Sequence, residues 1–454
     1  MKKQIISIAL FLFSFAAFPQ NTLQSSLSEL LTDDIFTGSD ASLVVYDLTD
    51  DTLVFAHRAS KSVRPASVQK VLTSVVALNN LGTSYTVDTR LLRDTVSGGF
   101  YVKGSMDPLF GENDILSMAM SVPAGTVIDT LFADCSFCDS LYWGPGWSWD
   151  DNPYAYQPYL SPLMLCGGAV EVTVTPTAAG EAPAYSCVPS SSFYTIVNEA
   201  ECNNRELGKL TILRDWLEDS NVIRITGNCE REKRVELNMY KSADFFMAVL
   251  VEKLDSLGVT VNNISFATTP DSCCSVLYEN KRCITDIVEE ALMESNNLCA
   301  ESLLYHLGAK NSTATVSMSQ GCEVVKRFIV NKLGFESGFA VADGSGLSLY
   351  NYTTADILLA ALRYAASRPR ISAVLNRALP LSGVSGTLKN RTKGTVAYKK
   401  VRAKTGTVKG VCTLAGYATA SDGRRYAFVM LNSGMLSSRP MREWQDKVCE
   451  VLCR

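Results

Sequence analysis

Apolar residues alternate with polar ones, or form short continuous runs, at both ends of the chain, and both patterns are typical of β-strands. Residues 43–48 and 52–56 are two such runs on either side of polar turn residues, which predicts a hairpin near the N-terminus. Residues 401–408, 411–419 and 426–431 are three further runs separated by short turns that contain glycine. Their close spacing predicts an antiparallel meander.

Segments with the helical period lie around these strands. Residues 23–31 and 441–452 place apolar side chains at helical spacing, and residues 71–78 form an apolar run that follows a proline. Residues 284–294 and 298–307 predict two helices joined by a short loop. Both ends of the chain therefore contribute to one domain of the α/β class, an antiparallel sheet flanked by helices.

The middle of the chain has a different character. Its apolar runs are short, rich in β-branched residues and separated by turns, as in residues 170–174 and 222–227. This pattern predicts mostly-β domains inserted between the first and last thirds of the chain.

The first residues have the features of a secretory signal. Lys2 and Lys3 precede an almost wholly apolar run from Ile5 to Phe18, and cleavage is expected between residues 17 and 20. An uncleaved membrane anchor is the alternative, although the run is shorter than the ~20 residues that a membrane span needs. We therefore expect a secreted, periplasmic protein.

Composition narrows the choice of partners. The 454 residues are enough for about three domains. A net charge of -4, with no basic tract, argues against a nucleic-acid partner.

Cysteines are numerous behind the signal-like segment. An even number, 14, favours disulfide bonds in an oxidising compartment, and several bridges are expected in the insertion. Cys135 and Cys138 have the spacing of a zinc ligand pair, but no second pair of this kind accompanies them and the nearest histidine is His57. The sequence therefore predicts neither a metal nor another cofactor.

Three short motifs follow one another along the chain: Ser67-Val68-Gln69-Lys70, Ser295-Asn296-Asn297 and Lys404-Thr405-Gly406. Residues three apart share a helix face, so Lys70 is expected beside the Ser67 hydroxyl as its base. A lysine can accept a proton near neutral pH only if its pKa falls by about three units, which burial and a second cation such as Lys404 can cause. Each motif alone also fits a structural role, as a solvated i,i+3 pair, a helix cap or a surface turn.

A histidine-dependent hydrolase is the competing interpretation. His57 and His306 are the only histidines, and no nucleophile-elbow motif accompanies either of them. We interpret His306 as a structural residue of an apolar helix, and Trp147 and Trp149 as core residues of the insertion.

The ordered motifs are those of penicillin-binding proteins and class A β-lactamases. Pro65-Ala66-Ser67-Val68-Gln69-Lys70, Asp343-Gly344-Ser345-Gly346-Leu347-Ser348 with Asn351, and the stretch from Gly144 to Asp151 resemble the penicillin-binding D-alanyl-D-alanine carboxypeptidases that carry a large insertion between the first two motifs. One position departs from that family. Met106, in Gly104-Ser105-Met106-Asp107-Pro108, stands where a second glycine is expected, so a turn in the insertion is in question.

The resemblance implies a transpeptidase-like domain and two nested inserted domains. We expect a signal peptide at 1–20, the catalytic domain at 21–84 and 269–454, inserted domain II at 85–107 and 175–268, and inserted domain III at 108–174. It further implies a catalytic group of Ser67, Lys70 and Ser295, and a substrate-binding group of Asn297, Lys404, Thr405, Gly406 and Thr407.

The implied activity is that of a serine-type D-Ala-D-Ala carboxypeptidase, which acts on peptidoglycan stem peptides through an acyl-enzyme on Ser67. A DD-endopeptidase activity on cross-bridges is a further expectation, and β-lactam antibiotics are expected as inhibitors. Two alternatives stay open at this point: a β-lactamase, and a penicillin-binding sensor of the same fold without turnover. Peripheral membrane association and the oligomeric state are open as well.

Overall fold

The protein is described by a computed structural model that covers residues 20–270, 274–310, 312 and 315–454. Its first sheet joins the two ends of the chain, in the order β14 (Val401–Val408), β15 (Val411–Thr419), β16 (Arg425–Ser433), β1 (Asp40–Asp47) and β2 (Thr52–His57). All neighbouring strands are antiparallel. The predicted hairpin, meander and fold class are confirmed.

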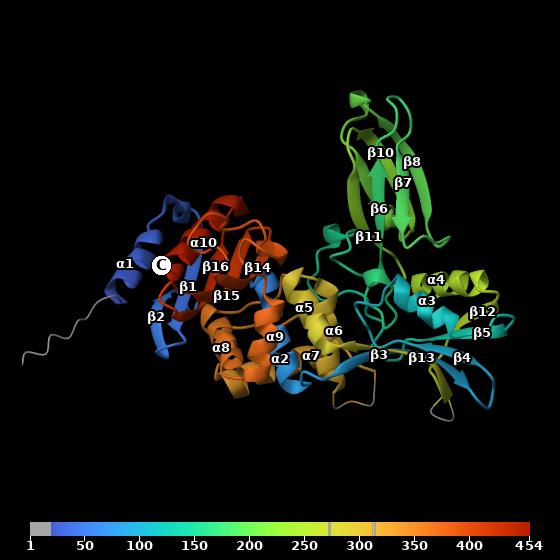
Figure 1. The fold of residues 1–454 in the computed structure, drawn as a ribbon, viewed down its shortest axis with the longest axis horizontal. Coiled ribbons are helices and arrows are strands. Elements are labelled where there is room, and N and C mark those ends of the chain that lie inside the picture. Colours follow the sequence, from blue (N-terminus) through green and yellow to red (C-terminus); the bar gives the residue numbers. More distant parts are fainter. Residues whose placement is uncertain (1–19, 271–273, 311, 313–314) are drawn as a thin grey trace, which may run out of the picture.

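Helices cover both faces of this sheet (Figure 1). One face carries α1 (Gln20–Leu30) and α10 (Ser438–Cys453), and the indole of Trp444 in α10 donates to the Leu30 carbonyl at 2.7 Å. The other face carries the larger helical layer. This layer comprises α2 (Gln69–Asn80), α5 (Ile284–Met293), α6 (Asn297–Ala309), α7 (Met318–Phe328), α8 (Ala355–Ala366) and α9 (Pro369–Ala378).

The period of two in β1 explains why the sheet is covered on both faces. Leu43 and Val45 belong to the core under α1 and α10, whereas Val44 and Tyr46 belong to the core under the larger helical layer. Burial of both faces fixes the register of this strand, since a slip by one residue would exchange the two sets of side chains.

The insertion contains a second five-stranded sheet. Its order is β12 (Thr260–Phe266), β5 (Val127–Asp134), β4 (Phe100–Lys103), β3 (Thr86–Asp94) and β13 (Cys274–Cys283). Helices α3 (Glu112–Met120) and α4 (Ser242–Ser256) belong to the same lobe.

Two three-stranded sheets complete the insertion and project away from the body of the molecule in Figure 1, where they are drawn in green. One has the order β8 (Thr195–Cys202), β10 (Val222–Cys229) and β9 (Thr211–Arg214), and the other β11 (Lys233–Asn238), β6 (Ala169–Thr175) and β7 (Ala184–Val188). The five-stranded sheet, α3, α4 and both small sheets share one hydrophobic core.

Strand pairing differs from the expected domain boundaries. Strand β5 lies in the range 108–174, yet it pairs with β4 and β12 of the five-stranded sheet. Strand β13 lies in the range 269–454, yet it pairs with β3. Parallel pairs such as β4–β5 join segments that are distant in sequence, so spacing alone could not reveal them.

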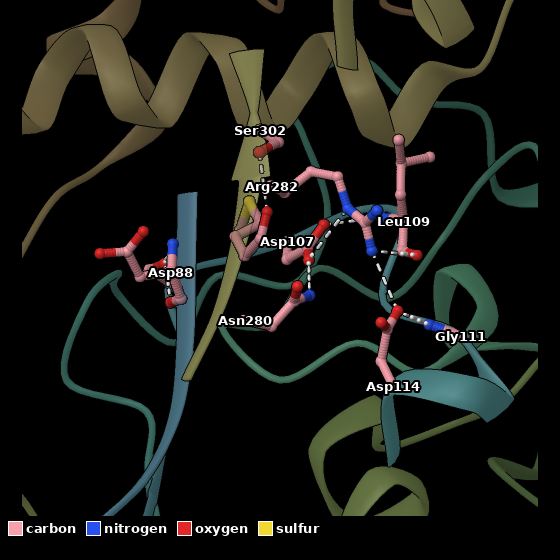
Figure 2. Close-up of polar contacts among 10 residues, drawn as sticks. Asp88, Asp107, Leu109, Gly111, Asp114, Asn280, Arg282 and Ser302 are labelled. Atoms are coloured by element: carbon pink, nitrogen blue, oxygen red, sulfur yellow. Dashed lines mark hydrogen bonds and ion pairs between the residues drawn. The ribbon is translucent and has the colours of Figure 1, made fainter. Parts of the chain in front are cut away.

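A partly buried polar cluster lies where the insertion meets the catalytic domain (Figure 2). Arg282 of β13 lies 2.9 Å from a carboxylate oxygen of Asp114 and 3.5 Å from one of Asp107, and it also donates to the Leu109 carbonyl at 3.2 Å. Asn280 donates to Asp107 at 3.0 Å. Burial raises the pKa of Asp107 to about 6, against the opposing effects of the Leu109 amide and Arg282.

Met106, the departure from the family pattern, occupies the turn beside this cluster. Its φ of 62° lies in the left-handed region that favours glycine, which explains the expected residue. The methionine side chain is fully buried, and its backbone carbonyl accepts a 2.7 Å hydrogen bond from Ser302 of α6. The turn therefore persists, with side-chain burial opposing a local cost of roughly 1–2 kcal/mol.

Twelve of the described cysteines are free thiols and do not form the expected disulfides. Apart from Cys283, which is exposed, they pack in the hydrophobic cores or at their margins, as small apolar residues do. The cysteines concerned are Cys135, Cys138, Cys166, Cys187, Cys202, Cys229, Cys283, Cys299, Cys322, Cys412, Cys449 and Cys453. Among the described helices, none is long and apolar enough to cross a membrane.

Candidate active site

Ser67 lies in a tight 3-10 turn, Ala66–Val68, that leads directly into α2. Ala66 has a φ of 49°, a left-handed conformation that redirects the chain just before the serine. The Lys70 amine lies 3.0 Å from the Ser67 hydroxyl oxygen. The spacing of the first motif therefore brings the two side chains together, as predicted.

Lys70 is fully buried, and its amine has two further hydrogen-bond acceptors. These are the side-chain oxygen of Asn297 at 2.6 Å and the backbone carbonyl of Ser345 at 2.9 Å. Burial lowers the pKa of Lys70 to about 8, while the charges of Asp343 and Glu301 oppose this shift. Burial, and not the neighbouring lysine, is the main cause of the shift that a lysine base requires.

In the second motif, the middle residue caps a helix and the two residues on either side of it face the active site. Asn296 is the N-cap of α6, because its side chain accepts the Cys299 amide at 3.1 Å. Ser295, with a φ of 66°, and Asn297 are thereby left to face the two lysines. Ser295 accepts from Lys404 at 2.8 Å, and the amide nitrogen of Asn297 donates to the Tyr156 carbonyl at 2.7 Å.

Lys404 lies on β14 and is also fully buried. Its amine donates to Ser295 and, at 2.8 Å, to the Thr405 carbonyl. Burial and then the charge of Lys70 hold the pKa of Lys404 well below its usual range. The charge of Lys404 was expected to lower the pKa of Lys70, but it is the charge of Lys70 that lowers the pKa of Lys404.

Gly406 lies against the turn that carries Ser67. A Cβ at this position would lie 2.2 Å from the Thr413 hydroxyl and 2.9 Å from the Ser67 nitrogen. The missing side chain therefore lets β14 approach this turn. A side chain here would displace Ser67.

Strand β14 is an edge strand of its sheet. The Ala403 amide donates outward to the Pro380 carbonyl at 3.1 Å, so strand alternation directs the amides of Thr405 and Thr407 to the same free edge. This edge runs beside Ser67 and has backbone groups available to an extended ligand. Thr405 also donates to the Thr387 hydroxyl at 2.8 Å.

A loop of residues 343–348 packs against the turn that carries Ser67 and against the Lys70 amine. Asp343 accepts the amides of Gly346 and Ser348 at 2.8 Å and 2.6 Å, and the Trp147 indole at 3.0 Å. Gly346 has a φ of 82°, and a Cβ there would lie 1.9 Å from the Ala66 carbonyl. The sequence marked this stretch only by resemblance and assigned no role to it.

Ser67 opens into a cleft of about 760 Å³. Ser295, Asn297 and Thr407 also line it, together with residues of the insertion: Ser148, Asp150, Asp151 and Tyr156. A second cavity of about 730 Å³ shares Tyr156, Glu294, Ser295 and Asn297 with the cleft.

The aromatic and histidine predictions fare differently. Trp147 is half-buried, but it packs against the core of the catalytic domain and not against that of the insertion. Trp149 is 63% exposed and contacts Trp216, so neither tryptophan is a core residue of the insertion. His306 is buried beside Tyr85, and burial lowers its pKa to about 4. It therefore remains neutral and structural.

Within the described part of the chain, no group of histidine, cysteine and carboxylate side chains is arranged to hold a metal ion.

The fold and this serine–lysine arrangement agree with the family comparison. Residues 23–454 match the model of the D-Ala-D-Ala carboxypeptidase 3 (S13) family, so the chain belongs to that family. The protein is accordingly a serine-type D-Ala-D-Ala carboxypeptidase.

Individual relatives support the same class. The chain is 29% identical to a D-alanyl-D-alanine carboxypeptidase of an Actinomadura species, over 92% of this chain and 82% of the relative. It is 25% identical to a carboxypeptidase of Haemophilus influenzae, over 95% and 94% of the two chains. The crystal structure of penicillin-binding protein 4 from H. influenzae has the same fold, with a TM-score of 0.79, 21% identity and coverage of 93% and 98%.

Proposed function

We propose that Ser67 is the nucleophile of this carboxypeptidase and that Lys70 is its general base. The observation that carries this assignment is the 3.0 Å approach of a fully buried lysine amine to the serine hydroxyl. The neutral amine takes the hydroxyl proton while the serine oxygen attacks the carbonyl of the terminal D-Ala-D-Ala bond. The bond to the terminal D-alanine breaks, and an acyl-enzyme remains on Ser67.

The oxyanion that forms during attack needs two donors. The amides of Ser67 and Thr407 fit this role, because Gly406 brings β14 against the Ser67 turn and the Thr407 amide points to the free edge. The leaving amine needs a proton, and Ser295, held by Lys404, is the proposed relay. Water then hydrolyses the acyl-enzyme and regenerates the serine.

The remaining motif residues are proposed to hold the substrate. Thr405 and Thr407 lie on the free edge of β14, where a peptide ending in D-Ala-D-Ala would pair in extended form. Lys404 is proposed to bind the terminal carboxylate, because the negative charge of the carboxylate favours the protonated form of this buried amine and opposes the lowering of its pKa. Asn297 receives the substrate's peptide carbonyl after its amide leaves the Tyr156 carbonyl.

Steady-state release of D-alanine from a peptide ending in D-Ala-D-Ala tests this proposal. The wild-type protein should release D-alanine and form a penicilloyl adduct detectable by intact-protein mass spectrometry. The Ser67→Ala variant should do neither. Acylation without turnover would instead identify a sensor, rapid hydrolysis of penicillin would identify a β-lactamase, and a full adduct on the Ser67→Ala protein would identify another nucleophile.

We further propose a DD-endopeptidase activity on peptidoglycan cross-bridges. The second cavity, which shares four residues with the cleft, offers space for another peptide beside the Ser295–Asn297 loop. A predatory endopeptidase of Bdellovibrio bacteriovorus has a similar fold, with a TM-score of 0.52 and 19% identity. Conversion of a purified cross-linked dimer to monomers tests this activity, and an intact dimer under conditions of D-alanine release would exclude it.

Inhibition by β-lactams and export to the periplasm are also proposed. A β-lactam complex of the Haemophilus protein has the same fold, with a TM-score of 0.73. Export rests on the signal-like segment 1–20, most of which lies outside the described residues. N-terminal sequencing of protein from a periplasmic extract should find a chain that begins near residue 20. A chain that retains Met1 would contradict cleavage.

A further inference from the structure

Glu301 is a fully buried carboxylate that the proposed reaction does not use. It lies on α6, one helical turn after Asn297, so the two side chains share a helix face. A glutamate is almost never fully buried without partners. Its two oxygens accept the consecutive backbone amides of Gly344 at 3.0 Å and Ser345 at 2.9 Å.

These amides belong to the loop behind the nucleophile. The Gly344 carbonyl accepts a 2.7 Å bond from the Thr73 hydroxyl of α2, and the Gly346 amide donates to Asp343 at 2.8 Å. The peptide unit between Ser345 and Gly346 is therefore fixed on both sides. Its carbonyl oxygen is the one that lies 2.9 Å from the Lys70 amine.

The position of the Ser345 carbonyl determines the direction in which the lone pair of the Lys70 amine points. A neutral lysine amine has two N–H groups and one lone pair. If the Asn297 oxygen and the Ser345 carbonyl accept the two N–H groups, the lone pair is left facing the Ser67 hydroxyl, 3.0 Å away. A displaced Ser345 carbonyl would leave the amine free to rotate away from the serine.

We propose that Glu301 is a positioning residue of the acylation step, which holds the Ser345 carbonyl against the Lys70 amine through the amides of Gly344 and Ser345. This inference rests on the proposed roles of Ser67 and Lys70. It adds a residue outside the three motifs to the machinery that orients the base.

Glu301 also acts on the proton affinity of the base. Burial, and then the charge of Asp343, raises the pKa of Glu301, while the amides of Gly344 and Ser345 favour its ionised form. When Glu301 is ionised, its charge raises the pKa of Lys70, as does the charge of Asp343. A glutamine at position 301 cannot ionise, so Lys70 should then lose its proton at lower pH. The other titratable groups coupled to Glu301 or Lys70 are Cys299, Tyr305, Cys322 and Lys404.

The Glu301→Gln variant tests the proposal. Glutamine keeps the size of the side chain but presents an NH2 group to one of the two amides, so one of the two hydrogen bonds is lost. The rate of penicilloyl adduct formation, followed by intact-protein mass spectrometry between about pH 6 and 9, should fall roughly tenfold or more at pH 7. The acid limb of the pH profile should also move to lower pH.

Ser302→Ala is the matched control. Ser302 neighbours Glu301 on α6 and is fully buried, but its hydroxyl donates to Met106 and not to the 343–348 loop. It should lower the melting temperature while leaving the wild-type rate and profile in place.

The outcomes separate two failures. A wild-type acylation rate in Glu301→Gln would overturn the positioning role, and so would a rate loss with an unmoved acid limb that Ser302→Ala reproduces. Wild-type protein that forms no adduct at all would instead contradict the proposed function of Ser67.

Discussion

Two charged clusters of the molecule, the junction with the insertion and the active site, balance their charge differently. At the junction with the insertion, Arg282 lies within 2.9 Å and 3.5 Å of two carboxylates. In the active site, the hydrogen bonds of Lys70 and Lys404 go to neutral oxygens, and among the described residues neither lysine forms an ion pair. At the junction, opposite charges lie beside each other, whereas in the active site the two lysine amines have neutral hydrogen-bond acceptors.

This difference separates a structural cluster from a reactive one. Opposite charges favour the ionised form of each partner, so they resist proton transfer. Neutral acceptors fix the direction of an amine and contribute less to the stability of its charged form. Burial can then lower the pKa of Lys70 to about 8 despite the more distant Asp343 and Glu301.

The largest effect should follow from removing the base. Lys70→Ala should slow acylation of Ser67 by penicillin about 10²- to 10⁴-fold, the usual contribution of a general base. Adduct formation by intact-protein mass spectrometry measures the rate. Lys70→Arg is the control for charge, because arginine stays protonated and should be as slow. An active Lys70→Arg protein would show that proton acceptance by residue 70 is not required.

Removing the cation of the junction should damage stability and not chemistry. Arg282→Ala leaves Asp107 and Asp114 without their cation and should cost about 3 kcal/mol of unfolding free energy, the lower end for a buried pair, because Arg282 and Asp114 are 24% and 26% exposed. Urea denaturation measures this cost. The control is Arg90→Ala, which removes a partly exposed pair with Glu279 and should cost about 1 kcal/mol or less. Equal losses in the two variants would contradict the structural role of the junction.

The junction should also make stability depend on pH. The pKa of Asp107 is about 6 in the folded protein and about 3.9 when unfolded. Its stabilising contribution is therefore complete below about pH 4 and disappears as the pH rises through 6. Asp107→Asn should flatten this part of the stability–pH curve, by up to about 3 kcal/mol. An unchanged slope in the variant would assign the dependence to other groups.

The second buried lysine should have an intermediate effect. Lys404→Ala should lower kcat/KM for peptides with a free terminal carboxylate about ten- to a hundredfold, because a charge-assisted contact is worth roughly 1.5–3 kcal/mol. Lys409→Ala is the control, since this lysine also lines the cleft but does not contact Ser295. If Lys409→Ala caused the larger loss, the carboxylate-binding lysine would have been misassigned.

The smallest change concerns the turn beside the junction. Met106→Gly relieves a left-handed residue, worth roughly 1–2 kcal/mol, but removes a fully buried side chain, worth about 2–5 kcal/mol. Burial should win, and the variant should be less stable by about 1–3 kcal/mol in thermal unfolding. A more stable variant would show that backbone strain dominates.

Local pattern was sufficient to predict most of the catalytic domain. The helices expected at 284–294 and 298–307 are observed at Ile284–Met293 and Asn297–Ala309. The motif spacing also placed Lys70 beside Ser67, because i,i+3 neighbours depend only on helix geometry. These features are decided within a few residues of chain.

The features that sequence reasoning missed depend on distant segments. Glu301 was overlooked because a glutamate in a helix is usually exposed, and only the 343–348 loop gives it a reason to be buried. The contact of Gly406 with the Ser67 turn was not predicted because the approach of that turn cannot be seen from β14 alone. The cysteines were assigned to disulfides from their number, whereas the burial of most of them as thiols in the hydrophobic cores is a tertiary property.

The pairing of β1 with β16 has a consequence for how the enzyme reaches its active form. Asp40 pairs with Ser433, so β1 can form its hairpin with β2 early, but its other edge stays unpaired until β16 has been made. Contacts between such distant residues form slowly, because a long loop must close before they can be made. The strand that lies against Ser67, Val401–Val408, is made long after Ser67 itself. During synthesis Ser67 therefore remains without the strand that completes its surroundings, and the proposed catalytic arrangement forms only after β14 has been added.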